Sequence, residues 1–143
     1  MGFRRKSREL AMQALFYIDT EVDCSSEEAL ALFCQNFSPA DDVQPFFEKL
    51  VKGVIAHQSE IDTVISKNSK NWKLNRMPSV DRNIMRIAVF ELFYCRDIPA
   101  KVSINEAIDI GKKFGTPESG SFINGILDSV YLNDIEKKEG MNS

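Results

Sequence analysis

The stretch from Val80 to Tyr94 is the feature that most limits the possible folds. Apolar side chains fall on most sides of a helix built from it: Ile84, Met85, Ile87, Ala88, Val89, Phe90, Leu92 and Phe93. A helix that is apolar all round has to be buried, so other elements must surround it. The stretch therefore predicts the central helix of a helical bundle.

Helix signals recur along the rest of the chain, and strand signals are weak. Leu10, Ala14, Tyr17 and Ile18 share one face of a first helix predicted over about 3–20. Further helix starts are predicted from capping residues and capping boxes. They lie at Ser25 with Glu28, at Ser79, at Ser103 with Glu106, and at Thr116 before Pro117.

These signals predict an all-α fold of about seven helices in two packed small helical bundles. One domain is expected over residues 1–133, with sub-bundles roughly at 1–57 and 58–133, and the charged tail at 134–143 is expected to be disordered. A hydrophobic content of 43% with 27% charged residues is typical of a soluble globular protein. No apolar run approaches the length of roughly 18 residues that a membrane span needs.

Positive charge is concentrated at the start of the chain. Four of the first eight residues are basic, Arg4, Arg5, Lys6 and Arg8, whereas the whole chain carries a net charge of −3. A local basic cluster on an acidic protein can still bind a polyanion. Cations at a helix N-terminus oppose the helix dipole, which favours an external anion as their partner. The cluster therefore predicts an RNA-binding surface.

Sequence preference on RNA requires contacts to unpaired bases, which stack on aromatic side chains. Phe16 follows the arginines on the same side of the first helix, and Gln13 can read a base edge. Phe122 follows Ser119-Gly120-Ser121, where small residues allow a base to approach closely. The residues alone leave open whether Phe16 and Phe122 are core positions instead.

The sequence contains no recognisable catalytic or metal-binding motif. His57 is the one histidine, and Cys24, Cys34 and Cys95 form no close pair, so reduced thiols and no metal site are expected. Glu91, within the apolar stretch, needs a partner, and Arg76 is the candidate. We therefore expect a non-enzymatic protein without a cofactor.

Four blocks of residues carry a resemblance to a known family. They are Arg4 to Glu9 with Ala11 and Gln13 to Phe16; Trp72 to Arg76 with Asp81 to Ala88 and Glu91-Leu92; Ile98-Pro99 with Val102 to Ala107; and Phe122 to Asp128. In this order and spacing they resemble the NusB family of bacterial transcription antitermination factors. The resemblance covers nearly the whole chain.

The resemblance implies an all-α protein that binds the single-stranded boxA element of ribosomal RNA operon transcripts. It would do so with the small-subunit ribosomal protein NusE, as part of the RNA polymerase antitermination complex. The implied RNA-binding residues are Arg4, Arg5, Lys6, Arg8, Gln13, Phe16 and Phe122. Asp81 and Arg82 are implied to lie near the protein partner. Some members self-associate across the RNA-binding side, and for this chain a homodimer stays an open alternative.

Three other interpretations are weighed against this one. The same helical domain occurs attached to ribosomal RNA cytosine methyltransferases, but the Gly-rich cofactor loop of such an enzyme is not found here. A purely protein-binding adaptor would bind no RNA at low salt. An exported protein is the third, because Arg4 to Ile18 resembles a signal peptide. Glu9 and Gln13 interrupt its apolar part, however, and acidic residues follow it, so we expect a cytoplasmic protein.

Overall fold

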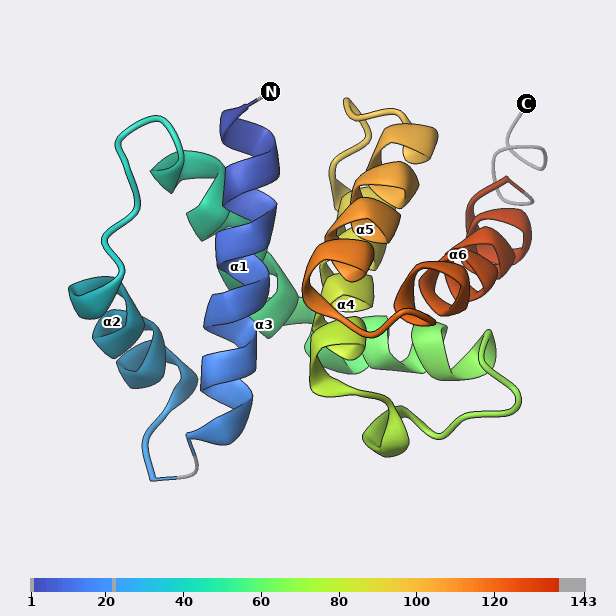
Figure 1. Cartoon of the computed structure of the whole chain (residues 1–143), viewed down its shortest axis with the longest axis horizontal. Coiled ribbons are helices and arrows are strands. Elements are labelled where there is room, and N and C mark those ends of the chain that lie inside the picture. Colours follow the sequence, from blue (N-terminus) through green and yellow to red (C-terminus); the bar gives the residue numbers. More distant parts are fainter. Residues whose placement is uncertain (1, 22, 137–143) are drawn as a thin grey trace.

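The computed structural model describes residues 2–21 and 23–136, and helices are the only regular secondary structure in this part of the chain, as the sequence predicts. It contains six α-helices, a short 3-10 helix and a final π-helical turn (Figure 1). They are α1 (Phe3–Thr20), α2 (Ser26–Asn36), α3 (Gln44–Lys67), η1 (Leu74–Arg76), α4 (Ser79–Tyr94), α5 (Ala100–Phe114), α6 (Ser119–Val130) and η2 (Tyr131–Glu136). None of these helices combines the length and the apolar character that crossing a bilayer requires.

The difference between seven predicted helices and six arises at His57. The apolar stripe from Phe46 to Ile55 predicts one helix, and Ile61, Val64 and Ile65 predict a further turn or helix after it. In the structure α3 includes both and is kinked between them at His57, which has φ −115° and ψ 18°. Helix α1, helix α2 and the first part of α3 lie on one side of the molecule, and helices α4 to α6 lie on the other (Figure 1). The predicted division into two sub-bundles stays a prediction, because one apolar core extends across both sides.

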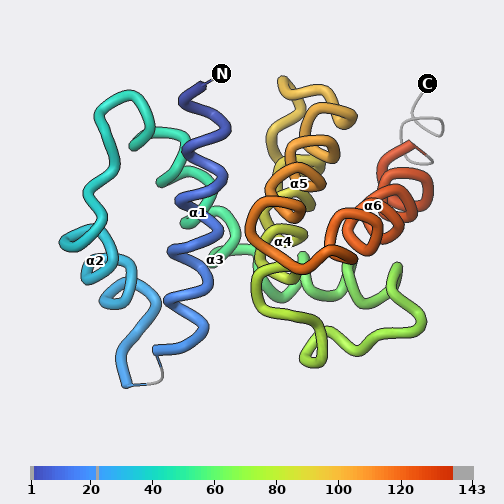
Figure 2. The backbone as a smooth tube through the Cα atoms, viewed as in Figure 1, coloured from blue at the N-terminus to red at the C-terminus, as the bar shows by residue number. Residues whose placement is uncertain are grey.

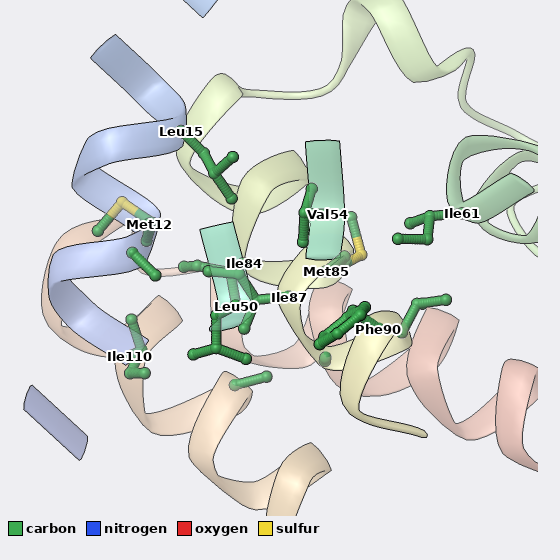
Figure 3. Close-up of a cluster of buried hydrophobic side chains, with 14 of the residues drawn as sticks. Met12, Leu15, Leu50, Val54, Ile61, Ile84, Met85, Ile87, Phe90 and Ile110 are labelled. Atoms are coloured by element: carbon green, nitrogen blue, oxygen red, sulfur yellow. The ribbon is translucent and has the colours of Figure 1, made fainter. Parts of the chain in front are cut away.

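The core is centred on α4, as the apolar stretch predicts. Ile84, Met85 and Ile87 on α4 are buried together with side chains of α1, α3 and α5 (Figure 3). Helix α4 packs against α1, α3, α5 and α6, so it is surrounded on most sides. Gly53 lets α3 approach α4 closely, since a Cβ atom at this position would lie 2.2 Å from Cζ of Phe90 on α4.

Three local predictions at helix ends are wrong. Helix α4 begins at Ser79 itself, which is preceded by Pro78. Helix α5 begins at Ala100, so Ser103 and Glu106 lie within the helix and form no capping box. Helix α6 begins at Ser119 rather than at Pro117, and the Ser119 hydroxyl accepts a hydrogen bond from the amide of Thr116.

The first three residues of the predicted tail, 134–136, belong to η2. Asp134 and Ile135 are buried in η2, and Asp134 accepts hydrogen bonds from Lys67 and Asn68 at the end of α3 and just after it. These polar contacts and the burial of Ile135 explain why the turn is ordered despite its charged sequence. Residues 137–143 of the predicted tail lie outside the described residues.

Candidate nucleic-acid interface

The first turns of α1 form one wall of a groove of about 1180 Å³. The groove lies between the start of α1, the segment before α3, and α5. The first turn of α1 contains no acidic residue, and Gly2 provides no side-chain cap, so the exposed amides add to the positive potential of the helix N-terminus. Its lining residues are Gly2, Phe3, Arg4, Arg5, Lys6, Arg8, Glu9, Ala40, Asp42, Val43, Val102, Glu106 and Lys113.

Arg4 and Lys6 present their charges to solvent. The guanidinium of Arg4 lies 5.4 Å from the centre of the Phe46 ring and 3.9 Å from the carboxylate of Asp97. Both side chains of the Arg4–Asp97 pair are about half exposed or more, and such pairs contribute little binding energy. Lys6 is exposed. The start of α1 and the loop that carries Asp97 lie at the same end of the molecule (Figure 2).

Arg5 is partly neutralised by helix α5. Its Nε donates a hydrogen bond to Glu106 over 2.7 Å, and its Nη2 donates to Asp109 over 3.0 Å. The hydrogen bond to Glu106 raises the pKa of Arg5, and the same bond lowers the pKa of Glu106. The Arg5 side chain is 36% exposed, so it reaches solvent with two carboxylates beside it.

Arg8 lies inside the protein. Its Nε and Nη2 each donate to the carboxylate of Glu91 over 2.8 Å, and its Nη1 donates to Glu106 over 3.1 Å. Ser103 also donates to Glu91 over 2.8 Å. Burial by itself would lower the pKa of Arg8, but the hydrogen bonds and charges of Glu91 and Glu106 outweigh burial and raise it. Arg8 thus binds α1 to α4 and α5, and the predicted pairing of Glu91 with Arg76 is wrong.

A signal for the burial of Arg8 is present in the sequence. Ala11, Met12 and Leu15 follow Arg8 at spacings of three, four and seven residues, and all three are buried. Residues at these spacings share one face of a helix. The buried face of α1 therefore includes position 8, and the charge of the arginine conceals this in the sequence.

The remaining predicted RNA-binding residues lie away from the groove. Gln13 is half-buried, and Phe16 is 41% exposed at a distance of about 18 Å along α1 from Arg4, given the rise of a helix. Phe122 is half-buried near the start of α6, where its ring meets Trp72 edge to face. The structure thus brings Arg4, Arg5 and Lys6 together and places the aromatic residues farther along.

Asp81 and Arg82, predicted near a protein partner, are held by internal contacts. Asp81 is 3% exposed and accepts a hydrogen bond from Ser119 over 2.9 Å. Burial raises the pKa of Asp81, against the opposing effect of the Ser119 hydrogen bond. Arg82 donates to the carbonyl of Leu74 over 3.2 Å and lies 3.5 Å from Asp19. Both side chains therefore connect the start of α4 to neighbouring elements.

The three cysteines are free thiols. Within residues 2–21 and 23–136, no group of three or more His, Cys, Asp or Glu side chains is arranged to hold a metal ion.

Comparison with known proteins gives consistent similarities over most of the chain. A model of the NusB family matches residues 5–132. The transcription antitermination protein NusB of Desulfatibacillum aliphaticivorans is 61% identical over 132 residues, which are 92% of each chain. A structure of T. maritima NusB is 35% identical with a TM-score of 0.82, and the match covers 96% of each chain. The NusB of a complex of NusB and NusE with double-stranded RNA is 26% identical, with a TM-score of 0.80 over 92% of this chain and 98% of that one.

Proposed function

The chain belongs to the NusB family, and on that premise we propose that it is a transcription antitermination protein that binds the boxA element of ribosomal RNA operon transcripts. It binds this RNA together with NusE and helps RNA polymerase to resist termination in the cytoplasm. The observation that carries the proposal is the groove at the start of α1, where Arg4 and Lys6 are exposed on an otherwise acidic chain. The related complex that contains NusB, NusE and double-stranded RNA supports the same classes of partner.

The basic residues have different roles in this proposal. Arg4 and Lys6 bind phosphates directly, with Lys6 acting as a point charge because it lacks the bidentate geometry of arginine. Arg5 binds a phosphate while it remains close to Glu106 and Asp109. Arg8 holds α1 in place and does not touch RNA, because its guanidinium is itself buried and pairs with the buried carboxylate of Glu91 and the partly buried one of Glu106.

Preference for boxA comes from contacts to bases. Phe16 and Phe122 offer ring faces or edges for stacking, and Gln13 offers an amide that can pair with a base edge. Asp81 and Arg82 act on partner binding indirectly, because they fix the start of α4 against α6 and η1. NusE binding then depends on the shape of this region rather than on either charge.

A binding titration at two salt concentrations tests the proposal. With two or three phosphates bound, a fourfold rise in salt should weaken binding of single-stranded RNA about 7- to 18-fold. The protein should prefer a boxA-like strand to a scrambled strand of the same composition, and NusE should increase that preference. Equal affinity for both strands in the presence of NusE would rule out the specific role. Absence of RNA binding at low salt would favour a protein-binding adaptor.

Phe122 and Lys6 should differ in how their loss affects binding. We expect Phe122→Ala to reduce the preference for the boxA-like strand about fivefold, because its ring holds a base in place while the edge of that base is read, and losing one stacked base costs at least that factor. Lys6→Ala should weaken both strands equally and reduce the salt slope by about 0.7. Fluorescence anisotropy with both strands measures these effects. A uniform loss for Phe122→Ala would show that its ring supports the fold and reads no base.

Asp109 should restrain RNA binding through Arg5. It is 53% exposed, so Asp109→Asn removes a charge beside Arg5 without disturbing the core. We expect affinity for both strands to rise about two- to fivefold at low salt, and the gain to fade near about 0.5 M salt. Glu27→Gln on α2 is the matched control, because it changes net charge equally at a position that does not line the groove. An equal gain in both variants would assign the effect to net charge alone.

A further inference from the structure

Trp72 is the only tryptophan of the chain, and the residue is 52% exposed. Its ring centre lies 5.8 Å from that of Phe122, and the two ring planes meet at 75°. The edge of one ring therefore contacts the face of the other, a favourable geometry for aromatic pairs. This arrangement fixes the orientation of the indole while half of its surface stays open to solvent.

Trp72 lines a pocket of about 500 Å³ between the end of α3 and η1. Lys70 and Lys73, which flank it in the sequence, line the same pocket and are exposed. The backbone around the indole is held by local hydrogen bonds. The amide of Trp72 donates to the carbonyl of Ser69, and the Ser69 hydroxyl donates to the carbonyl of Trp72. An aromatic ring that shares a pocket with two exposed lysines suits a nucleotide, which combines a flat base with a charged phosphate.

Helix α5 lines part of the basic groove, and α6, which packs against α5, contacts Trp72 of this pocket. Lys113 lines the groove and pairs with Glu9 of α1. The next residue back, Lys112, lies against Gly120, where its side chain comes within 3.0 Å of the position a Cβ would occupy. Gly120 is two residues before Phe122, which in turn contacts Trp72. Helices α5 and α6 thus carry a lysine of the groove, a lysine packed on Gly120 and the aromatic ring that contacts Trp72.

We propose that the Trp72 pocket is a second RNA subsite, in which one base of the bound strand stacks on the indole and Lys70 and Lys73 bind the flanking phosphates. This inference rests on the proposed function, because that function brings the strand to Phe122. It extends the strand beyond Phe122 by at least one nucleotide. Stacking on a flat ring tolerates any base, so this subsite adds affinity and leaves the preference for boxA to other residues.

The emission of Trp72 reports on the subsite directly, because no other tryptophan contributes. We expect a boxA-like strand to quench this emission in parallel with the rise in anisotropy of a labelled strand. The strand is then shortened stepwise from each end. At some length it should still bind the basic groove, as seen by anisotropy, but no longer quench the emission of Trp72. Quenching that never accompanies binding, at any strand length, would overturn the proposal.

Substitutions at Trp72 separate stacking from packing. We expect Trp72→Ala to weaken binding of the full strand about 5- to 30-fold and to affect boxA-like and scrambled strands equally. Trp72→Phe, which keeps an aromatic face, should restore most of that affinity. The matched control is Phe37→Ala: Phe37 is 55% exposed and stacks on Phe33, but it lies at the end of α2. Its loss should leave RNA binding unchanged.

The lysines provide an independent readout. Lys70→Ala combined with Lys73→Ala should lower the salt slope by about 1.4 for a full-length strand and leave it unchanged for a strand too short to quench Trp72. Circular dichroism melting of each variant shows whether the fold is retained. If NusE alone quenches Trp72 and RNA does not, the pocket binds protein and the proposal is overturned. In that case a preserved preference for boxA in the Trp72→Ala variant would leave the proposed function standing.

Discussion

Replacing Glu91 with alanine should lower the free energy of unfolding by about 3–5 kcal/mol, the usual cost of leaving one charge of a buried pair without its partner. Arg8 is 3% exposed and Glu91 is 1% exposed, so water cannot take the place of the missing carboxylate. Glu106 still accepts one hydrogen bond from Arg8 over 3.1 Å, but Nε and Nη2 of Arg8 lose both of theirs. Ser103 also loses the acceptor of its hydroxyl.

Urea denaturation followed by circular dichroism measures this loss. The double variant Arg8→Met with Glu91→Leu is the matched comparison, because it replaces both charges by apolar side chains. Such replacements are often neutral or stabilising, so we expect the double variant to recover most of the stability that Glu91→Ala loses. If the single variant costs less than about 1 kcal/mol, the range typical of exposed pairs, then the Arg8–Glu91 pair is solvated in solution.

Arg86→Ala should be the next most damaging change, with an expected loss of about 2–3 kcal/mol. Arg86 donates to both oxygens of Asp62 on α3, over 2.8 and 3.0 Å, and to Asp19 on α1 over 3.3 Å. Its side chain is only 7% exposed. The expected loss is smaller than at Glu91, because the two carboxylates left behind are about a quarter exposed and water can reach them.

Lys52→Ala is the control for the Arg86 variant. Lys52 also pairs with a carboxylate, that of Glu48 one turn earlier on α3, but both side chains are well exposed. Denaturation midpoints should therefore shift clearly for Arg86→Ala and stay within experimental error for Lys52→Ala. Similar shifts in the two variants would mean that the connection between α1, α3 and α4 through Arg86 does not stabilise the fold.

Local sequence patterns predicted one capping box correctly and one wrongly. Ser25 and Glu28 form a true capping box at the start of α2, with hydrogen bonds in both directions. Ser103 and Glu106 have the same spacing, but α5 has already begun at Ala100, after Pro99. There the serine hydroxyl donates to Glu91 and the glutamate accepts from Arg5 and Arg8. The start of α5 at Ala100 rules out the box at the second site, and distant charged residues then pair with both side chains.

The basic surface was only partly predictable for the same reason. The sequence identifies the cluster at the start of α1, and the structure confirms that Arg4 and Lys6 are exposed. The sequence cannot identify Arg8 as the partner of Glu91, because 83 residues separate the two along the chain. Apart from the family resemblance, the sequence indicates no function for Trp72, because an isolated aromatic residue in a polar segment shows no periodicity. Its position beside Phe122 follows only from the packing of α6 near the end of α3.

A ribosome makes Arg8 long before it makes the acceptors of Arg8. Glu91 and Glu106 follow after 83 and 98 residues, which take about 4 to 20 seconds at usual elongation rates. Until then Arg8 lacks the two carboxylates that it pairs with in the folded protein. Burying the face of α1 that carries Arg8 would therefore place an unpaired cation in an apolar environment. The first helix must therefore dock late in biogenesis, and a nascent chain that stops short of α5 displays loose basic residues instead of a finished RNA-binding surface.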